Sequence, residues 1–106
     1  MTSGRVLPAN AHPETSRRFD ELVAALSQVD EPETMAKVLR DLCTVAELDA
    51  MGQRLQVARL VNDGVSYQEV SRRTGASTAT VTRVAQWLRR GEGGYQAILP
   101  APRGKS

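Results

Sequence analysis

The chain has 106 residues, 41% of them hydrophobic, and its 14 lysines and arginines against 12 acidic residues leave a formal charge of +2. This length accommodates one domain, and the hydrophobic content is that of a folded protein rather than a disordered one. One cysteine, Cys43, excludes an internal disulfide and a cysteine-rich zinc site, and no apolar run reaches the length of a membrane span or a signal peptide. We therefore expect a cytoplasmic protein.

The first part of the chain predicts two helices behind a flexible arm. Residues 1–13 combine glycine and proline without apolar periodicity, so we expect the arm there and a helical domain over residues 14–99. Apolar residues then recur at the spacing of one helix face: Phe19, Leu22, Val23, Leu26 and Val29. Pro32, at a first-turn position that tolerates its missing N–H, restarts the chain. A second stripe follows it: Met35, Val38, Leu39 and Leu42.

A longer helix is predicted to follow Thr44. Thr44 and Glu47 form a capping-box pattern, and the next apolar stripe reaches Val61 before Asn62-Asp63-Gly64 closes the helix. No segment alternates with period two over the length of a strand, so the all-α class is predicted. A loose tail is expected over residues 100–106.

Residues 66–90 have the layout of a helix-turn-helix. Ser66 and Ser77 are N-cap residue types in front of two helical stretches, and a three-residue turn separates these stretches. Gly75 stands where a sharp turn needs a positive φ, and Ser71 is small where the two helices approach each other. Apolar residues occupy the facing positions: Val70, Ala76, Val81 and Val84.

The second helix of such a motif enters the major groove of DNA, and its exposed residues suit that task. Hydroxyls near its N-terminus can bond phosphates or base edges, and small methyl-bearing side chains can contact thymine methyls. Polar residues of the first helix would lie beside the phosphate backbone. The predicted DNA-binding residues are Gln68, Arg72, Arg73, Ser77, Thr78, Ala79, Thr80, Thr82 and Arg83.

The charge distribution agrees with DNA binding without requiring it. Residues 1–63 carry seven basic and ten acidic residues, a balance of −3, whereas residues 64–106 carry seven basic and two acidic residues, a balance of +5. A basic half favours a polyanion as partner, although an ordinary solvated surface can have the same composition.

Residues 19–99 resemble the trp repressor superfamily, and within it the YerC/YecD family of TrpR-related proteins. The run TGASTATVTRV at residues 74–84 and the sequence Gly93-Gly94-Tyr95 carry the resemblance. It implies a six-helix fold, an intertwined homodimer formed through the N-terminal helices, and a sequence-specific transcriptional repressor bound to double-stranded DNA of the nucleoid. A partner that completes the core would also account for an aromatic content of only 4%.

The resemblance includes a position for a tryptophan corepressor, but this chain departs from it there. Arg54 and Arg83 match the ligand-contacting arginines of the tryptophan-sensing repressor. Val84 stands where that protein has glycine, and Trp87 where it has serine, so larger side chains would fill the space that the indole needs. We therefore expect no tryptophan corepressor and no other cofactor; one hypothesis is that Trp87 itself holds the reading helix in place.

Other conspicuous residues are interpreted as structural. His12 lacks a second ligand nearby, so no metal site is predicted, and Cys43 is expected to be half-buried packing. The glycines of residues 91–94 lack the Lys-Ser/Thr of a phosphate loop and are expected to form a helix cap and a bend. Tyr67 and Tyr95 are expected to pack rather than to stack on bases.

The sequence leaves two classes of function open and gives no support to a third. The leading interpretation is a DNA-binding regulator. The alternative is a helix-turn-helix module that binds mainly a protein partner, whose complex would be insensitive to salt. The sequence contains no nucleophile–base pair, paired carboxylates or metal cluster, so no enzymatic activity is predicted.

Overall fold

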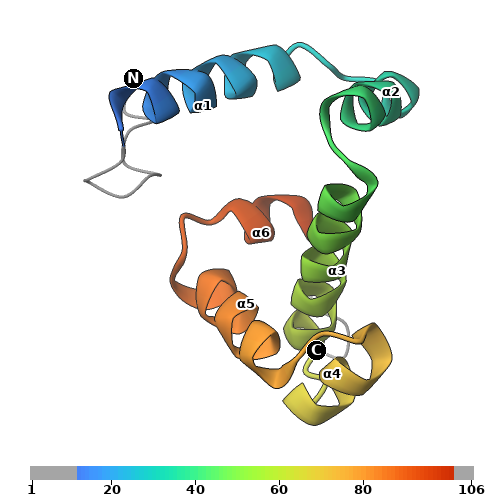
Figure 1. Cartoon of the computed structure of the whole chain (residues 1–106). Helices are drawn as coiled ribbons and strands as arrows, with labels where there is room; N and C mark the ends of the chain where they lie inside the picture. Colours follow the sequence, from blue (N-terminus) through green and yellow to red (C-terminus); the bar gives the residue numbers. More distant parts are fainter. Residues whose placement is uncertain (1–11, 102–106) are drawn as a thin grey trace. The chain divides into compact units, whose positions relative to one another are not determined.

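The structure, a computed structural model, describes residues 12–101. These residues form helices and turns without a strand, which confirms the predicted all-α class and the six-helix fold (Figure 1). The chain divides into two compact units, one up to Thr44 and one from Val45 onward, and each is described by itself. The helices are α1 (Pro13–Leu26), α2 (Pro32–Leu42), α3 (Val45–Asn62), α4 (Tyr67–Thr74), α5 (Thr78–Arg90) and α6 (Gly94–Ile98).

The first unit contains α1 and α2. His12 caps α1, because its Nδ1 accepts a hydrogen bond from the backbone N–H of Glu14 at 3.0 Å. Of the predicted arm, residues 1–11 lie outside the described residues, and Pro13 is already helical. Val29 lies beyond the end of α1, contrary to the predicted stripe, since its N–H bonds to the carbonyl of Leu26 at 3.1 Å in a turn. α2 begins at Pro32, as predicted.

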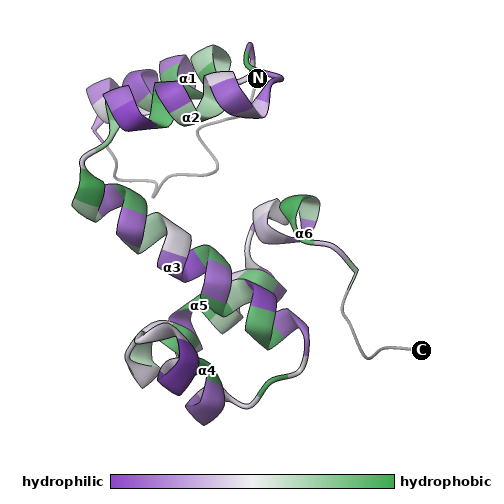
Figure 2. Cartoon of the chain, turned by 90° about the vertical axis from the view of Figure 1, so that its right-hand side faces the viewer, coloured by the Kyte–Doolittle hydropathy of each residue, from purple (hydrophilic) through white to green (hydrophobic). Residues whose placement is uncertain are grey.

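The apolar stripes of α1 and α2 are only partly covered within the described chain. Neither helix buries a residue. Leu22, Val23 and Leu42 are 39%, 45% and 56% exposed, and Figure 2 shows hydrophobic segments on both helices. Burial of an apolar face normally stabilises an amphipathic helix, since removal of apolar surface from water contributes about 25 cal/mol per Å². Within the described chain these two helices lack much of that stabilisation.

The second unit has a small aliphatic core between α3, α4 and α5. α4 and α5 pack against α3 and against each other, and α6 packs on α5 (Figure 1). The facing valines predicted from the sequence are buried there, together with the C-terminal half of α3. The core residues are Val57, Ala58, Val61, Val70, Ala76, Val81, Val84, Ala85 and Leu88. Tyr67 and Tyr95 pack against this core, as predicted.

A bend after α5 returns the chain to the core. Gly91 caps α5, and Gly93, with a φ of +89°, opens α6, so the glycine-rich segment is the cap and bend that the sequence predicted. The side chain of Gln96 donates to the carbonyl of Leu88 at 2.9 Å. Asn62 donates to the carbonyl of Pro100, the first residue of the predicted tail, at 3.3 Å. No helix of the described part of the chain is long and apolar enough to cross a membrane.

Candidate nucleic-acid interface

The turn between α4 and α5 has the geometry that the sequence predicted. Gly75 follows α4 with a φ of +78°, and its N–H bonds to the carbonyl of Ser71 at 2.9 Å. The hydroxyl of Ser71 donates to the carbonyl of Ala76 at 2.6 Å, across the point where the two helices meet. A larger side chain at this point would separate the helices, which explains the small residue at position 71.

Further hydrogen bonds fix the same turn, and one of them joins it to α3. The hydroxyl of Thr74 donates to the carbonyl of Val70 at 2.8 Å and accepts from the N–H of Ala76 at 3.2 Å. Gln53 of α3 donates to the carbonyl of Thr74 at 3.1 Å. Side chains of α3 and α4 therefore hold the turn, so α5 leaves it in a defined direction.

The N-terminus of α5 is capped by Ser77, as predicted. Its hydroxyl accepts from the N–H of Thr80 at 3.1 Å and donates to the Thr80 hydroxyl at 3.1 Å. Thr80 is half-buried. Both side chains are thus engaged in the helix start, which satisfies one of the free N–H groups of the first turn.

The remaining predicted residues of α5 share one exposed face. Thr78, Ala79, Thr82 and Arg83 are exposed, whereas the opposite side of the helix lies in the core. Gln86 is exposed as well and extends this face by one turn from Thr82. Gln86 was not among the residues predicted from the sequence, although the spacing of four residues along 78, 82 and 86 would have indicated it.

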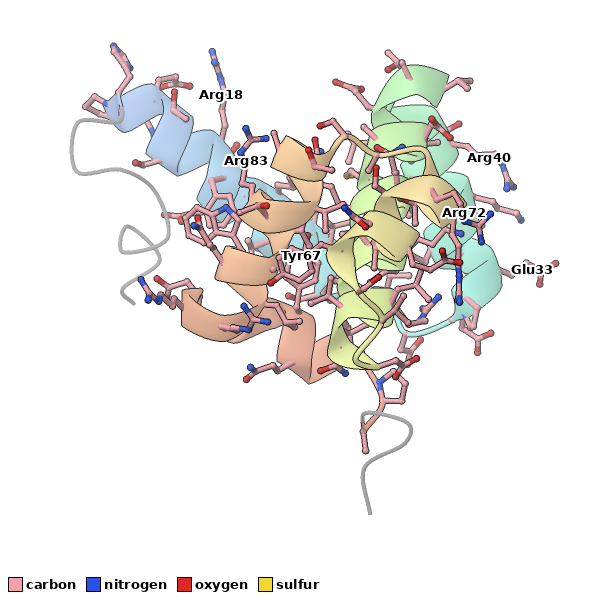
Figure 3. The ribbon with its side chains drawn as sticks, turned by 90° about the horizontal axis from the view of Figure 1, so that it is seen from below. Arg18, Glu33, Arg40, Tyr67, Arg72 and Arg83 are labelled. Atoms are coloured by element: carbon pink, nitrogen blue, oxygen red, sulfur yellow. The ribbon has the colours of Figure 1, made fainter. Side chains whose placement is uncertain are left out.

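The predicted residues of α4 are also exposed, but two of them are paired with a residue outside the predicted set. Glu69 accepts hydrogen bonds from Arg72 and Arg73, whereas Gln68 is exposed beside them. The two guanidinium groups lower the pKa of Glu69 to about 2. Figure 3 shows Arg72 projecting from α4 and Arg83 from α5.

Tyr67 lies between the two helices of the motif (Figure 3). The guanidinium carbon of Arg89, near the end of α5, lies 6.0 Å from the centre of the Tyr67 ring, at the outer limit of a cation–π contact. Tyr67 is half-buried and packs against the core at the start of α4.

Comparison with known proteins identifies the family. The family model described as Trp repressor protein matches residues 17–102. The chain belongs to the Trp repressor family. Its members are regulatory DNA-binding proteins and not enzymes, so this TrpR-like chain is a helix-turn-helix protein of a regulatory family. The resemblance found in the sequence is thereby confirmed.

Individual relatives agree with this assignment. The TrpR-like chain is 35% identical over 83 residues to the uncharacterized protein YerC of Bacillus subtilis strain 168. The match covers 78% of this chain and 80% of YerC. A crystal structure of a Trp repressor candidate from Staphylococcus aureus has a TM-score of 0.72 and 34% identity, covering 92% of this chain and 90% of that one. A TrpR-like protein from Eubacterium eligens has a TM-score of 0.70 and 28% identity, covering 79% and 93%.

The two residues that the sequence predicted to fill a corepressor position differ in burial. Val84 is 2% exposed and belongs to the core, whereas Trp87 is 59% exposed. Trp87 lines an open hollow with Tyr95 and Ile98 of α6. Within the described chain the indole is not part of the core against which α5 packs, because Val84, Ala85 and Leu88 occupy the inner face of the helix.

Cys43 is half-buried at the end of α2, as predicted. Within residues 12–101 no three His, Cys, Asp or Glu side chains gather in a group that could hold a metal ion.

Proposed function

We propose that this TrpR-like protein is a sequence-specific transcriptional repressor that reads the major groove of double-stranded DNA with α5, in the cytoplasm and on the nucleoid. The observation that carries the proposal is the exposed face of α5, formed by Thr78, Ala79, Thr82 and Arg83. These side chains offer donors, acceptors and methyl groups for base edges. The buried side of the helix and the bonded turn keep them in one orientation, so the DNA meets a prearranged surface.

Phosphate contacts would come from the neighbouring helix α4. Arg72 and Arg73 are exposed on α4, and Gln68 lies on the same helix. The predicted site residues Ser77 and Thr80 are assigned a supporting part, because their hydroxyls bond to each other at the start of α5. Cationic contacts to phosphate release counterions, so affinity is expected to fall with salt at a slope of about −0.9 per phosphate contacted.

We also propose that the protein acts as a homodimer. The support is the exposed apolar surface of the first unit, where α1 and α2 bury no residue, together with Val45 and Met51 in the first half of α3, which are 84% and 39% exposed. A second copy that covers this surface would stabilise both chains. Two reading helices would then meet half-sites about one helical turn apart, and the operator would have two-fold symmetry.

No tryptophan corepressor is part of the proposal. The support is Val84, whose branched side chain lies on the inner face of α5 and is buried in the core. We expect calorimetric titration of the protein with tryptophan to give no binding heat. A measurable affinity would contradict this part.

The test of the function is selection from random duplexes. The purified full chain is incubated with the pool at moderate salt, and the retained DNA is sequenced. A symmetric motif with the expected spacing supports a dimeric reader, whereas retention without a motif refutes sequence specificity. No retention refutes DNA binding and favours the protein-partner module.

A variant pair then tests the reading face. Thr82→Ala should lower affinity for the selected duplex by about 1–3 kcal/mol and leave affinity for a scrambled duplex nearly unchanged. Gln56→Ala removes an exposed polar side chain of α3, outside the proposed reading face and the proposed dimer surface, and should leave both affinities unchanged. Equal losses on both duplexes for Thr82→Ala would contradict base readout by this residue.

A further inference from the structure

The most basic part of the chain contains an acidic residue at the centre of its arginines. Residues 64–106 have only two acidic residues, Glu69 and Glu92. Oε1 of Glu69 accepts from Nε of Arg72 at 2.9 Å, while Oε2 accepts from Nη2 of the same arginine and from Nε of Arg73 at 2.8 Å. One carboxylate therefore holds both guanidinium groups of α4.

The position of Glu69 in its helix makes this choice of partners informative. Ser66 caps α4 and accepts from the N–H of Glu69 at 3.2 Å, so Glu69 occupies the third helical position of a capping box. In a capping box the glutamate reaches back to the N–H of the cap residue. Here the carboxylate instead reaches forward to Arg72 and Arg73. Its bonding capacity is used on the arginines.

We propose that Glu69 is a specificity-determining positioning residue, which holds Arg72 and Arg73 ready for the phosphates of the correct site and reduces the attraction of this face to DNA of any sequence. The inference rests on the proposed function, since it concerns how the same face discriminates. Glu69 itself contacts no DNA in this proposal and acts through the two arginines.

The geometry leaves the arginines able to bind phosphate while they are held. Each guanidinium has several N–H groups in a fixed fork, and Glu69 engages two of those of Arg72 and one of those of Arg73. The side chains of Arg72 and Arg73 are 71% and 49% exposed, so the remaining donors face solvent. A phosphate can bond to them without displacing the carboxylate.

Positioning and charge affect the two kinds of complex differently. Non-specific binding depends on net positive charge and tolerates mobile side chains, so a fixed negative charge beside the arginines weakens it. A specific complex needs each phosphate contact at one place, and arginines that are already ordered lose less conformational entropy when they bind. The pKa of Glu69 is lowered to about 2, so the carboxylate stays ionised near neutral pH.

The simpler explanation is that these are ordinary ion pairs of an exposed helix, three and four residues apart, which stabilise α4 slightly. That explanation predicts a small change in stability on removal of the carboxylate. It also predicts that the added positive charge raises the affinities for specific and non-specific DNA by the same factor, so their ratio stays unchanged.

The experiment compares the wild-type protein with Glu69→Gln, Glu69→Asp and Glu92→Gln. Fluorescence anisotropy gives affinities for the selected duplex and for a scrambled duplex of the same length and composition. Glu69→Gln removes the charge and at least one of the three bonds, because its amide keeps only one acceptor oxygen. We expect affinity for the scrambled duplex to rise about threefold and affinity for the selected duplex to fall about threefold. The ratio of the two affinities then falls about tenfold.

The other variants separate charge from geometry. Glu69→Asp keeps the charge but is too short to hold both arginines, so affinity for the scrambled duplex should stay near wild type while affinity for the selected duplex falls. Glu92→Gln removes a charge from an exposed residue after α5 and should change both affinities by the same factor. Circular dichroism establishes that each variant folds, and Glu69→Asp tests the positioning alone if Glu69→Gln does not fold.

Three outcomes overturn the inference. A ratio for Glu69→Gln within about twofold of wild type would show that the ion pairs only stabilise α4. An equal loss of ratio in Glu92→Gln would show that net charge alone accounts for the effect. A wild-type protein that binds the two duplexes equally would refute the proposed function, and the inference with it, whereas discrimination by wild type that Glu69→Gln retains refutes the inference alone.

Discussion

Replacing Gly75 by alanine isolates the backbone strain of the turn between α4 and α5 from any loss of packing. Gly75 has a φ of +78°, a conformation that costs an alanine about 1–2 kcal/mol. The added Cβ would meet only Nε2 of Gln53, at 3.9 Å, which is an ordinary contact. No steric cost therefore adds to the strain.

The expected net loss is smaller than the strain alone. An alanine also restricts the unfolded chain, which offsets about 0.4–1 kcal/mol of the cost. We expect Gly75→Ala to lower the free energy of unfolding by about 1 kcal/mol, and the melting temperature by about 4–8 °C for a chain of this size. Urea unfolding followed by circular dichroism measures the change, at one protein concentration for all variants because an oligomer's stability depends on it.

Two control variants make the result decisive. Asparagine tolerates this region of backbone space, so Gly75→Asn should lose less than Gly75→Ala. Gly64 has a φ of +88° and open space around its Cβ, so Gly64→Ala should carry the same strain outside the turn. Gly75→Ala as stable as wild type, or Gly75→Asn less stable than Gly75→Ala, would refute the reasoning.

Further predictions concern the core, the turn and acid stability. Val70 is fully buried, so Val70→Ala should cost about 2 kcal/mol or more in urea unfolding; a loss under about 0.5 kcal/mol would contradict the core assignment. Ser71→Ala should cost about 1 kcal/mol because the carbonyl of Ala76 loses its donor, and an unchanged midpoint would argue against that bond. The pKa of Glu69 is about 2 in the folded protein against an ordinary 4.5, so the stability that its ion pairs contribute is present above pH 4.5 and is lost as the pH falls toward 2. The free energy of unfolding of Glu69→Gln should therefore fall less steeply with decreasing pH over this range than that of the wild type.

Local sequence determined where α2, α4 and α5 begin and where α4 ends. Pro32, Ser66 and Ser77 each stand at the start of a helix as predicted, and Gly75 has the positive φ that its place in the turn required. Each of these features depends on atoms within three or four residues, so sequence neighbours alone decide it. The same local spacing contained the pairing of Glu69 with Arg72 and Arg73, although the predicted site did not include it.

Helical periodicity also determined which side of each helix in the motif is buried. The valines of α4 and α5 that the spacing placed in the core are there, and the predicted reading residues Thr78, Ala79, Thr82 and Arg83 are on the opposite side. The periodicity works because one face of each of these helices packs on a single neighbouring surface.

Only the tertiary structure decided which polar groups are engaged and which large side chains stay exposed. Gln53 bonds to the carbonyl of Thr74, 21 residues away, only because α3 and α4 are packed together. Trp87, expected to support α5, is exposed because smaller residues complete the inner face of that helix. Contacts of this kind depend on how helices dock, and docking brings together residues whose separation along the chain carries no information about their distance in space.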